Sequence, residues 1–68
     1  MKISARNVLN GKIVDITKGA TTAHVRIDIN GAIVTASITN EAVEELGLKT
    51  GMTASAVIKS SDVMVAVA

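Results

Sequence analysis

Hydrophobic and polar positions alternate strictly along residues 22–29. Every second position is apolar: Ala23, Val25, Ile27 and Ile29. Because successive side chains of a β-strand point to opposite faces, this period of two predicts a strand with one buried and one solvated face. Asn30-Gly31 follows at once and favours a tight hairpin turn, since both residues tolerate a positive φ. We therefore predict an antiparallel hairpin in which residues 32–39 form the partner strand.

Three further segments are typical of strands, because they are rich in β-branched or alternating apolar side chains. They span residues 12–17, 53–59 and 63–67. Residues 3–9 are expected to form an extended segment that leads into the first of these strands. The last two strands are expected to be joined by a turn at Ser60-Ser61-Asp62, which contains common turn residues.

One short helix is predicted over residues 41–46. Thr39 or Asn40 can cap its N-terminus, because short side-chain oxygens accept hydrogen bonds from the first free backbone N–H groups. Val43 and Leu46 fall on its inward face. Gly47 favours a stop just after the last helical residue.

Five short strands with a helix between the third and the fourth is the order of elements in an OB-type barrel. Closure of a barrel also removes the free sheet edges that an apolar all-β chain would otherwise expose. We therefore predict an all-β fold, mostly β with one short helix, in the form of a five-stranded OB-like barrel. Residues 1–68 are expected to form a single domain.

The composition indicates a thin core that needs support from association. The 68 residues include no Phe, Trp, Tyr or Cys, although 49% are hydrophobic. A chain this short buries only about 60% of its unfolded surface, and small scaffolds compensate with disulfides, a metal or association. The absence of cysteine excludes disulfides, and one histidine with scattered carboxylates offers no zinc-ligand spacing. We therefore expect an oligomer.

Charge and hydropathy argue against a nucleic-acid or membrane partner. The formal net charge is +1, and no aromatic side chain is present on which bases could stack. A single-stranded nucleic-acid-binding OB domain is therefore a less favoured alternative. The N-terminus has no secretory signal pattern, and no stretch approaches the roughly 20 apolar residues of a membrane span. A cytoplasmic location is expected.

The residues that could perform catalysis are scattered. His24 occupies a polar position of an alternating strand, where a solvent-facing or interface role is expected. Asp15, Asp28 and Asp62 lie on different segments, and the glycines form no phosphate-binding fingerprint. We therefore expect no catalytic residues and no enzyme activity.

Two short polar clusters combine one cation with small donors. The N-terminal cluster is Ser4-Ala5-Arg6-Asn7, and the Lys59 cluster is Lys59-Ser60-Ser61. Arginine offers a planar fork of donors, lysine a point charge and serine an adjustable hydroxyl, which together suit a dianion whose oxygens are all acceptors. The alternative is that the first cluster is a polar chain end and the second an ordinary turn.

In combination, these clusters resemble the molbindins, small molybdate-binding proteins built on the transport-associated OB module. The similarity runs over essentially the whole chain. Its segments are Ile3-Ser4-Ala5-Arg6-Asn7, Gly11-Lys12-Ile13-Val14, Lys18-Gly19-Ala20, Thr22-Ala23-His24-Val25, Ser37-Ile38-Thr39, Val43-Glu44-Glu45-Leu46-Gly47-Leu48 and Ala56-Val57-Ile58-Lys59-Ser60-Ser61-Asp62-Val63. The resemblance implies binding of molybdate or tungstate at subunit interfaces of a homohexamer, a trimer of dimers, for intracellular storage or homeostasis. No organic cofactor and no free metal cation are implied. An oligomerisation or interaction module without a ligand is the main alternative.

The resemblance also implies the residues of the site. The main site would contain Ser4, the backbone of Ala5, Arg6, Lys59 and Ser60, with Asn7 and Ser61 as neighbours and Thr39 at the start of the short helix. Ala42 stands where related modules have a second hydroxyl, so only its backbone N–H could serve there. A second site near a threefold axis would draw on Lys18, Gly19, Ala20, Thr21 and Thr22.

Overall fold

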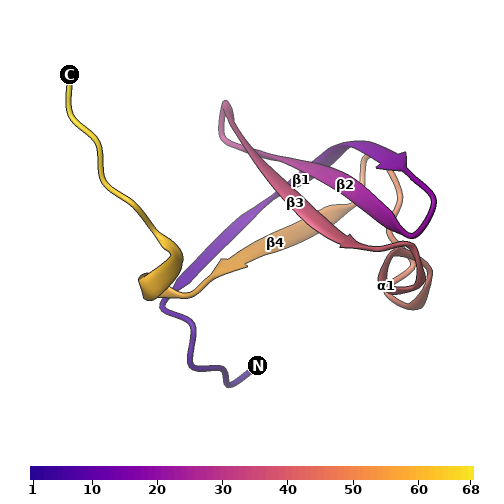
Figure 1. Ribbon diagram of the computed structural model, residues 1–68, viewed down its shortest axis with the longest axis horizontal. Coiled ribbons are helices and arrows are strands. Elements are labelled where there is room, and N and C mark those ends of the chain that lie inside the picture. Colours follow the sequence, from indigo (N-terminus) through magenta and orange to yellow (C-terminus); the bar gives the residue numbers. More distant parts are fainter.

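The computed structural model describes all 68 residues, and its four strands form one antiparallel sheet. The strands are β1 (Asn7–Lys18), β2 (Thr22–Ile29), β3 (Ala32–Thr39) and β4 (Thr53–Ile58). Their order in the sheet is β3-β2-β1-β4, so β3 and β4 are its two edges. Figure 1 shows that the sheet is strongly twisted and curls into a half-barrel, with the short helix α1 (Asn40–Glu45) at one end. The mostly-β prediction is confirmed.

The hairpin of β2 and β3 has the predicted bounds. Asn30 and Gly31 both have a positive φ, 55° and 103°, as the predicted tight turn requires. The Gly31 N–H donates a hydrogen bond of 2.8 Å to Oδ1 of Asp28, which holds the turn from its first strand.

β1 is longer than predicted, because its first half pairs with β4 and its second half with β2. The pairing with β2 shifts register between Ile13 and Asp15, which marks a β-bulge. Gly11 lies where β1 meets both neighbours, and a Cβ at this position would clash with the carbonyl oxygen of Asp28. The close approach of the two backbones therefore requires glycine.

The helix begins and ends at the predicted signals. The Thr39 hydroxyl accepts a 3.0 Å hydrogen bond from the Ala42 N–H, which confirms Thr39 as the N-cap. Gly47 follows the C-cap with a φ of 63°. Val43 is buried as expected, but Leu46 is 64% exposed, so its predicted inward position is wrong. Leu46 is the C-cap residue and lies on the open side of the half-barrel, where nothing from its own chain covers it.

The core of one chain is small. Only 7 of the 68 residues are buried, so most apolar side chains keep some contact with solvent. Six of the seven form one cluster inside the curl: Ile13, Ala23, Val25, Ile27, Val43 and Ala56. The apolar face of β2 therefore points inward, as the alternation in the sequence predicted. No helix has the length and apolar character that a membrane span requires.

The predicted fifth strand does not form within one chain. Residues 63–67 belong to no sheet, and Met64, Val65 and Val67 are each at least 90% exposed. The predicted turn is instead a short 3-10 helix, η1 (Ser60–Asp62), from which the chain leaves the sheet, as the yellow end in Figure 1 shows. The five-stranded prediction is therefore wrong for a single chain, because nothing pairs the last segment with the free edge of β4.

Candidate oxyanion-binding site

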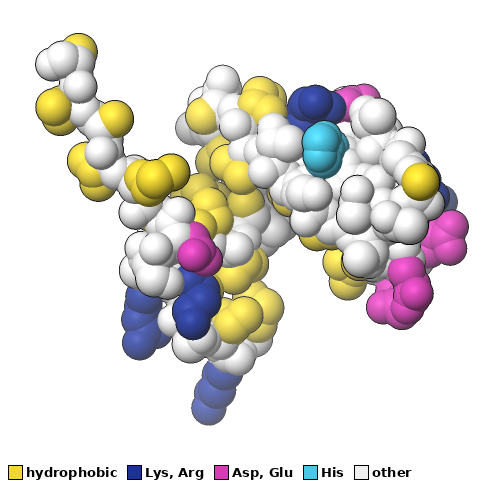
Figure 2. Space-filling model, viewed as in Figure 1, with side chains coloured by type: hydrophobic (Ala, Val, Ile, Leu, Met, Phe, Trp, Pro, Cys, Tyr) yellow, Lys and Arg dark blue, Asp and Glu magenta, His cyan; other side chains and the backbone are white.

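The β1–β4 ladder brings the two polar clusters to the same end of the sheet. Its terminal pair is Asn7 and Ile58, and the Asn7 side-chain N–H donates a 3.2 Å hydrogen bond to the Ile58 carbonyl oxygen. In an antiparallel ladder the residue before one member faces the residue after the other. Arg6 therefore leaves the sheet beside Lys59. In Figure 2, basic side chains gather at this end of the molecule.

Neither of these two cations forms an ion pair, although Asp62 follows Lys59 on η1 at the same end of the sheet. The ion pairs of the chain are Lys18 with Glu44 and Arg26 with Asp15, and neither involves Arg6 or Lys59. The guanidinium and ammonium donors at this end are thus free to face an anion. The serine hydroxyls of both clusters lie on the same short segments and add donors that rotate freely.

This end of a single chain is open to water. Ala5 is buried, whereas Ser4, Arg6, Lys59, Ser60 and Ser61 are exposed. Charge-assisted hydrogen bonds strengthen when solvent is excluded, so one chain alone offers a shallow, hydrated surface. An enclosing site at this end needs a second surface.

Thr39 lies at the other end of the sheet. Thr39 pairs with Thr22 at the start of β2, and the start of β2 lies beside Lys18 at the end of β1. Within one chain the structure therefore does not bring Thr39 to Arg6, so the two could share a site only through another copy. The Ala42 N–H is already bound to the Thr39 hydroxyl. That this N–H could also serve a ligand stays a prediction.

The residues expected for a second site form the turn between β1 and β2. Asn40 anchors this turn: its backbone N–H donates to the Thr21 carbonyl oxygen at 2.9 Å, and its side-chain N–H donates to the Gly19 carbonyl oxygen at 3.0 Å. A polar hollow beside the turn is lined by Thr17, Lys18, Gly19, Thr22 and His24. Ala20 and Thr21 do not line it.

Sequence reasoning missed two residues of this hollow, Thr17 and His24. They are cross-strand partners in the β1–β2 ladder, so the register alone could have found them. Lys18 also pairs with Glu44 at 3.5 Å, with both side chains well exposed. That carboxylate partly neutralises the one cation that lines the hollow.

The three carboxylates considered for catalysis lie on different elements, and two of them, Asp15 and Asp28, hold structural hydrogen bonds. Asp15 accepts a 2.7 Å hydrogen bond from Arg26 and one of 3.0 Å from Thr17. Asp28 holds the β2–β3 turn. His24 is exposed on β2, as its polar position predicted.

Comparison with known proteins identifies the family. The model of the TOBE domain family matches residues 3–65. The chain is 52% identical to molybdenum-pterin-binding protein 1 of Clostridium pasteurianum over 66 residues, which cover 96% of this chain and 97% of that protein.

Two solved structures are similar in both sequence and fold. The structure of a molybdate binding protein from Sporomusa ovata matches with a TM-score of 0.93 and 35% identity, covering 97% of this chain and 98% of the other. The structure of the cytoplasmic molybdate-binding protein ModG with molybdate bound matches with a TM-score of 0.89 and 48% identity, covering 94% of this chain and 46% of the other. Since the matches span nearly the whole chain, it belongs to the TOBE domain family, among the molybdenum-pterin-binding proteins, or molbindins.

Proposed function

We propose that the protein binds molybdate, or its near-isostere tungstate, reversibly at contacts between copies of the chain. The observation that carries the proposal is the β1–β4 register, which sets Arg6 beside Lys59 with no carboxylate partner for either. A tetrahedral dianion has only acceptor oxygens, and the two cations, the serine hydroxyls and the Asn7 amide of the clusters can all donate to it. The similarity to a molybdate-bound neighbour supports the same ligand.

The main site contains both clusters and draws on more than one copy. Its proposed members are Ser4, Ala5, Arg6, Asn7, Lys59, Ser60 and Ser61, with Thr39 contributed by another copy. The exposure of this end in one chain supports a shared site, because a desolvated dianion needs donors on several sides. A homohexamer built as a trimer of dimers would supply such contacts. The turn at residues 18–22 is the proposed second site.

The ligand is the inorganic oxyanion rather than a molybdenum-pterin. The names of the curated relatives include a pterin. A pterin ring is flat and aromatic, and proteins commonly hold such rings by stacking against aromatic side chains. This chain has no Phe, Trp or Tyr, whereas its charged donors match an oxyanion. The proposed role is storage or buffering of the anion in the cytoplasm, without catalysis.

Titration calorimetry with sodium molybdate, tungstate and sulfate tests the proposal. We expect heat from molybdate and tungstate, and much weaker binding of sulfate if the size of the cavity selects the ligand. A well-folded assembly that gives no heat with molybdate or tungstate would contradict the proposal and favour a purely structural interaction module. Addition of a pterin to the molybdate-saturated protein tests the choice of ligand, and no further heat is expected.

A further inference from the structure

One of the four asparagine side chains differs from the other three. The chain has four asparagines and no glutamine. The side chains of Asn7, Asn10 and Asn40 are each held by a hydrogen bond to a residue distant in the sequence. Asn30, in the β2–β3 turn, is exposed and its side chain forms no hydrogen bond. Its amide is therefore the one that rotates freely.

A free asparagine amide that precedes glycine reacts with its own main chain. The nitrogen of the next residue loses its proton and attacks the side-chain Cγ, which closes a five-membered succinimide ring and releases ammonia. Water then opens the ring at either of its two carbonyl carbons, so the products are aspartate and isoaspartate. In isoaspartate the main chain runs through the former side chain. Glycine hinders this attack least, because it has no Cβ.

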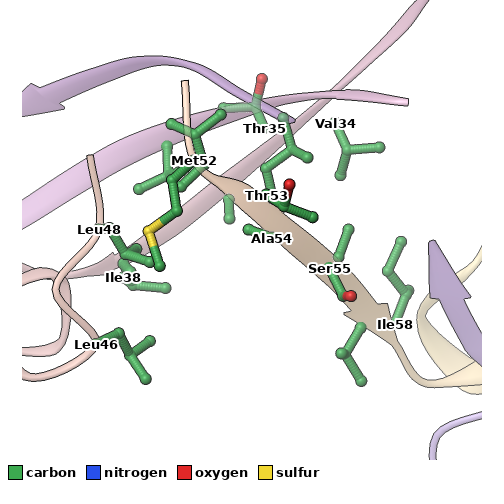
Figure 3. Close-up of a pocket in the computed structure, with 16 residues that line it drawn as sticks. Val34, Thr35, Ile38, Leu46, Leu48, Met52, Thr53, Ala54, Ser55 and Ile58 are labelled. Atoms are coloured by element: carbon green, nitrogen blue, oxygen red, sulfur yellow. The ribbon is translucent and has the colours of Figure 1, made fainter. Parts of the chain in front are cut away.

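The first of two Asn-Gly pairs, Asn10-Gly11, lies inside the β1–β4 ladder. Asn10 pairs with Ser55, and Gly11 pairs with Ala54. The Ser55 hydroxyl, drawn on β4 in Figure 3, donates a 2.7 Å hydrogen bond to Oδ1 of Asn10. Ring closure would have to break this bond and turn the peptide between Asn10 and Gly11 out of its extended conformation. The ladder therefore protects this pair.

The second pair, Asn30-Gly31, lies outside any ladder, because the last paired residues of the hairpin are Ile29 and Ala32. Both turn residues are exposed. No atom lies within 4 Å of the position that a Cβ of Gly31 would take. In Figure 1 the turn projects from the sheet at the opposite end of β3 from α1. The Asn30 side chain can therefore reach the Gly31 nitrogen without breaking a strand pair.

One contact in the turn opposes the reaction. The Gly31 N–H donates a 2.8 Å hydrogen bond to Oδ1 of Asp28. The Gly31 nitrogen must lose this proton before it attacks, and a nearby negative charge disfavours the formation of another. Asp28 therefore slows ring closure at the one Asn-Gly pair where the fold permits it.

We propose that Asn30-Gly31 is a site of spontaneous deamidation in the folded protein, and that Asp28 restrains its rate. The product replaces a neutral amide with a carboxylate, which lowers the formal net charge of +1 by one. Isoaspartate also lengthens the main chain of a two-residue turn that depends on a positive φ at both positions. The modified hairpin is therefore less stable than the original one.

The two Asn-Gly pairs can be followed separately in one sample. The protein is incubated at mildly alkaline pH, folded in buffer or unfolded in urea. A short, mildly acidic trypsin digestion then gives the peptides 7–12 and 27–49, because trypsin cuts after lysine and arginine. Fragment spectra locate the mass gain from replacement of NH2 by OH, and chromatography resolves aspartate from isoaspartate.

In the folded protein we expect Asn30 to react at least about 10-fold faster than Asn10, since the ladder must open before Asn10 can react. In urea the two rates should converge, because both pairs are then free. Equal rates in the folded protein would overturn the proposal. A folded protein in which Asn30 stays intact, while the same residue reacts in urea, would overturn it too.

Asp28→Ala tests the restraint. We expect the ratio of the Asn30 rate to the Asn10 rate to rise about 3-fold or more, because the acceptor of the Gly31 N–H is lost. The ratio excludes a general loosening of the fold, which would speed both reactions. Asp62→Ala removes a carboxylate on η1 and is the control, with no change expected. An unchanged ratio in Asp28→Ala would show that Asp28 does not restrain the reaction.

The effect on the hairpin is measured on the aged protein, which ion-exchange chromatography separates by its changed charge. We expect a lower Tm than that of the fresh protein. Asn30→Asp adds the charge without lengthening the main chain, so it should lower the Tm less than the isoaspartyl form does. Equal Tm values for aged and fresh protein would refute the predicted loss of stability.

Discussion

Asn7 and Ile58 are joined by both backbone and side chain: they form the last pair of the β1–β4 ladder, and the Asn7 side-chain N–H donates to the Ile58 carbonyl oxygen at 3.2 Å. They lie 51 positions apart in the sequence. Their pairing is the reason that Arg6 emerges beside Lys59, so the proposed anion site depends on it.

Replacement of Arg6 tests that site most directly. Arg6→Ala should weaken molybdate binding by about 2 kcal/mol, because it removes charge-assisted hydrogen bonds to a desolvated anion. Titration calorimetry measures the change. Lys49→Ala is the matched control, since Lys49 is an exposed cation between α1 and β4, and it should leave the affinity nearly unchanged. Equal affinities for Arg6→Ala and the unmodified protein would remove Arg6 from the site.

Bound molybdate should stabilise the folded assembly. At a free concentration 100 times the dissociation constant, the gain is about 2.7 kcal/mol per site if the unfolded chain does not bind. Thermal unfolding followed by calorimetry would show this as a rise in Tm with molybdate concentration. Sulfate at equal ionic strength is the control, and an identical rise with sulfate would point to a general salt effect.

The close approach of β1 and β2 at Gly11 should make this position intolerant of a side chain. Gly11→Ala places a Cβ against the Asp28 carbonyl oxygen and should lower the free energy of unfolding by about 1–3 kcal/mol. Urea unfolding measures it. The neighbouring Lys12→Ala removes an exposed side chain and should stay within about 0.5 kcal/mol of the unmodified protein. Similar losses for both variants would refute the steric explanation.

The N-cap of α1 should depend on the hydroxyl of Thr39. Thr39→Ala leaves the Ala42 N–H without its acceptor and should cost about 0.5–2 kcal/mol of stability. Thr39→Ser keeps the oxygen and should recover most of this loss in the same urea titration. If serine is as damaging as alanine, the methyl group rather than the cap supports this end of β3.

A charge in the C-terminal segment, residues 63–68, should disrupt assembly. Val65 is 90% exposed in one chain, and Val65→Asp would place a carboxylate in this apolar segment. Contacts between copies that bury the segment would then have to bury an unpaired charge, so we expect smaller species in sedimentation velocity at concentrations where the unmodified protein is associated. Thr50→Asp introduces the same charge at an exposed turn and should leave the distribution unchanged. A Val65→Asp protein that assembles normally would argue against burial of this segment.

Local signals in the sequence determined the β2–β3 hairpin and the helix. A period of two and the Asn30-Gly31 turn act between neighbours, and so do the Thr39 cap and the Gly47 stop. These features can therefore be predicted from the sequence without knowledge of the tertiary structure. The residue types of the two polar clusters also predicted an anion ligand from the sequence, and their role in binding it remains a prediction.

Only the tertiary structure decided which distant segments meet. The pairing of Asn7 with Ile58, the bulge after Ile13 and the polar hollow of Thr17 and His24 depend on strand register, which no local pattern specifies. The C-terminal segment shows most clearly what the sequence could not predict, because residues 63–67 belong to no sheet. Its valine-rich sequence predicts a strand, but a strand needs a partner edge. The path of the chain through η1 takes this segment away from its own sheet.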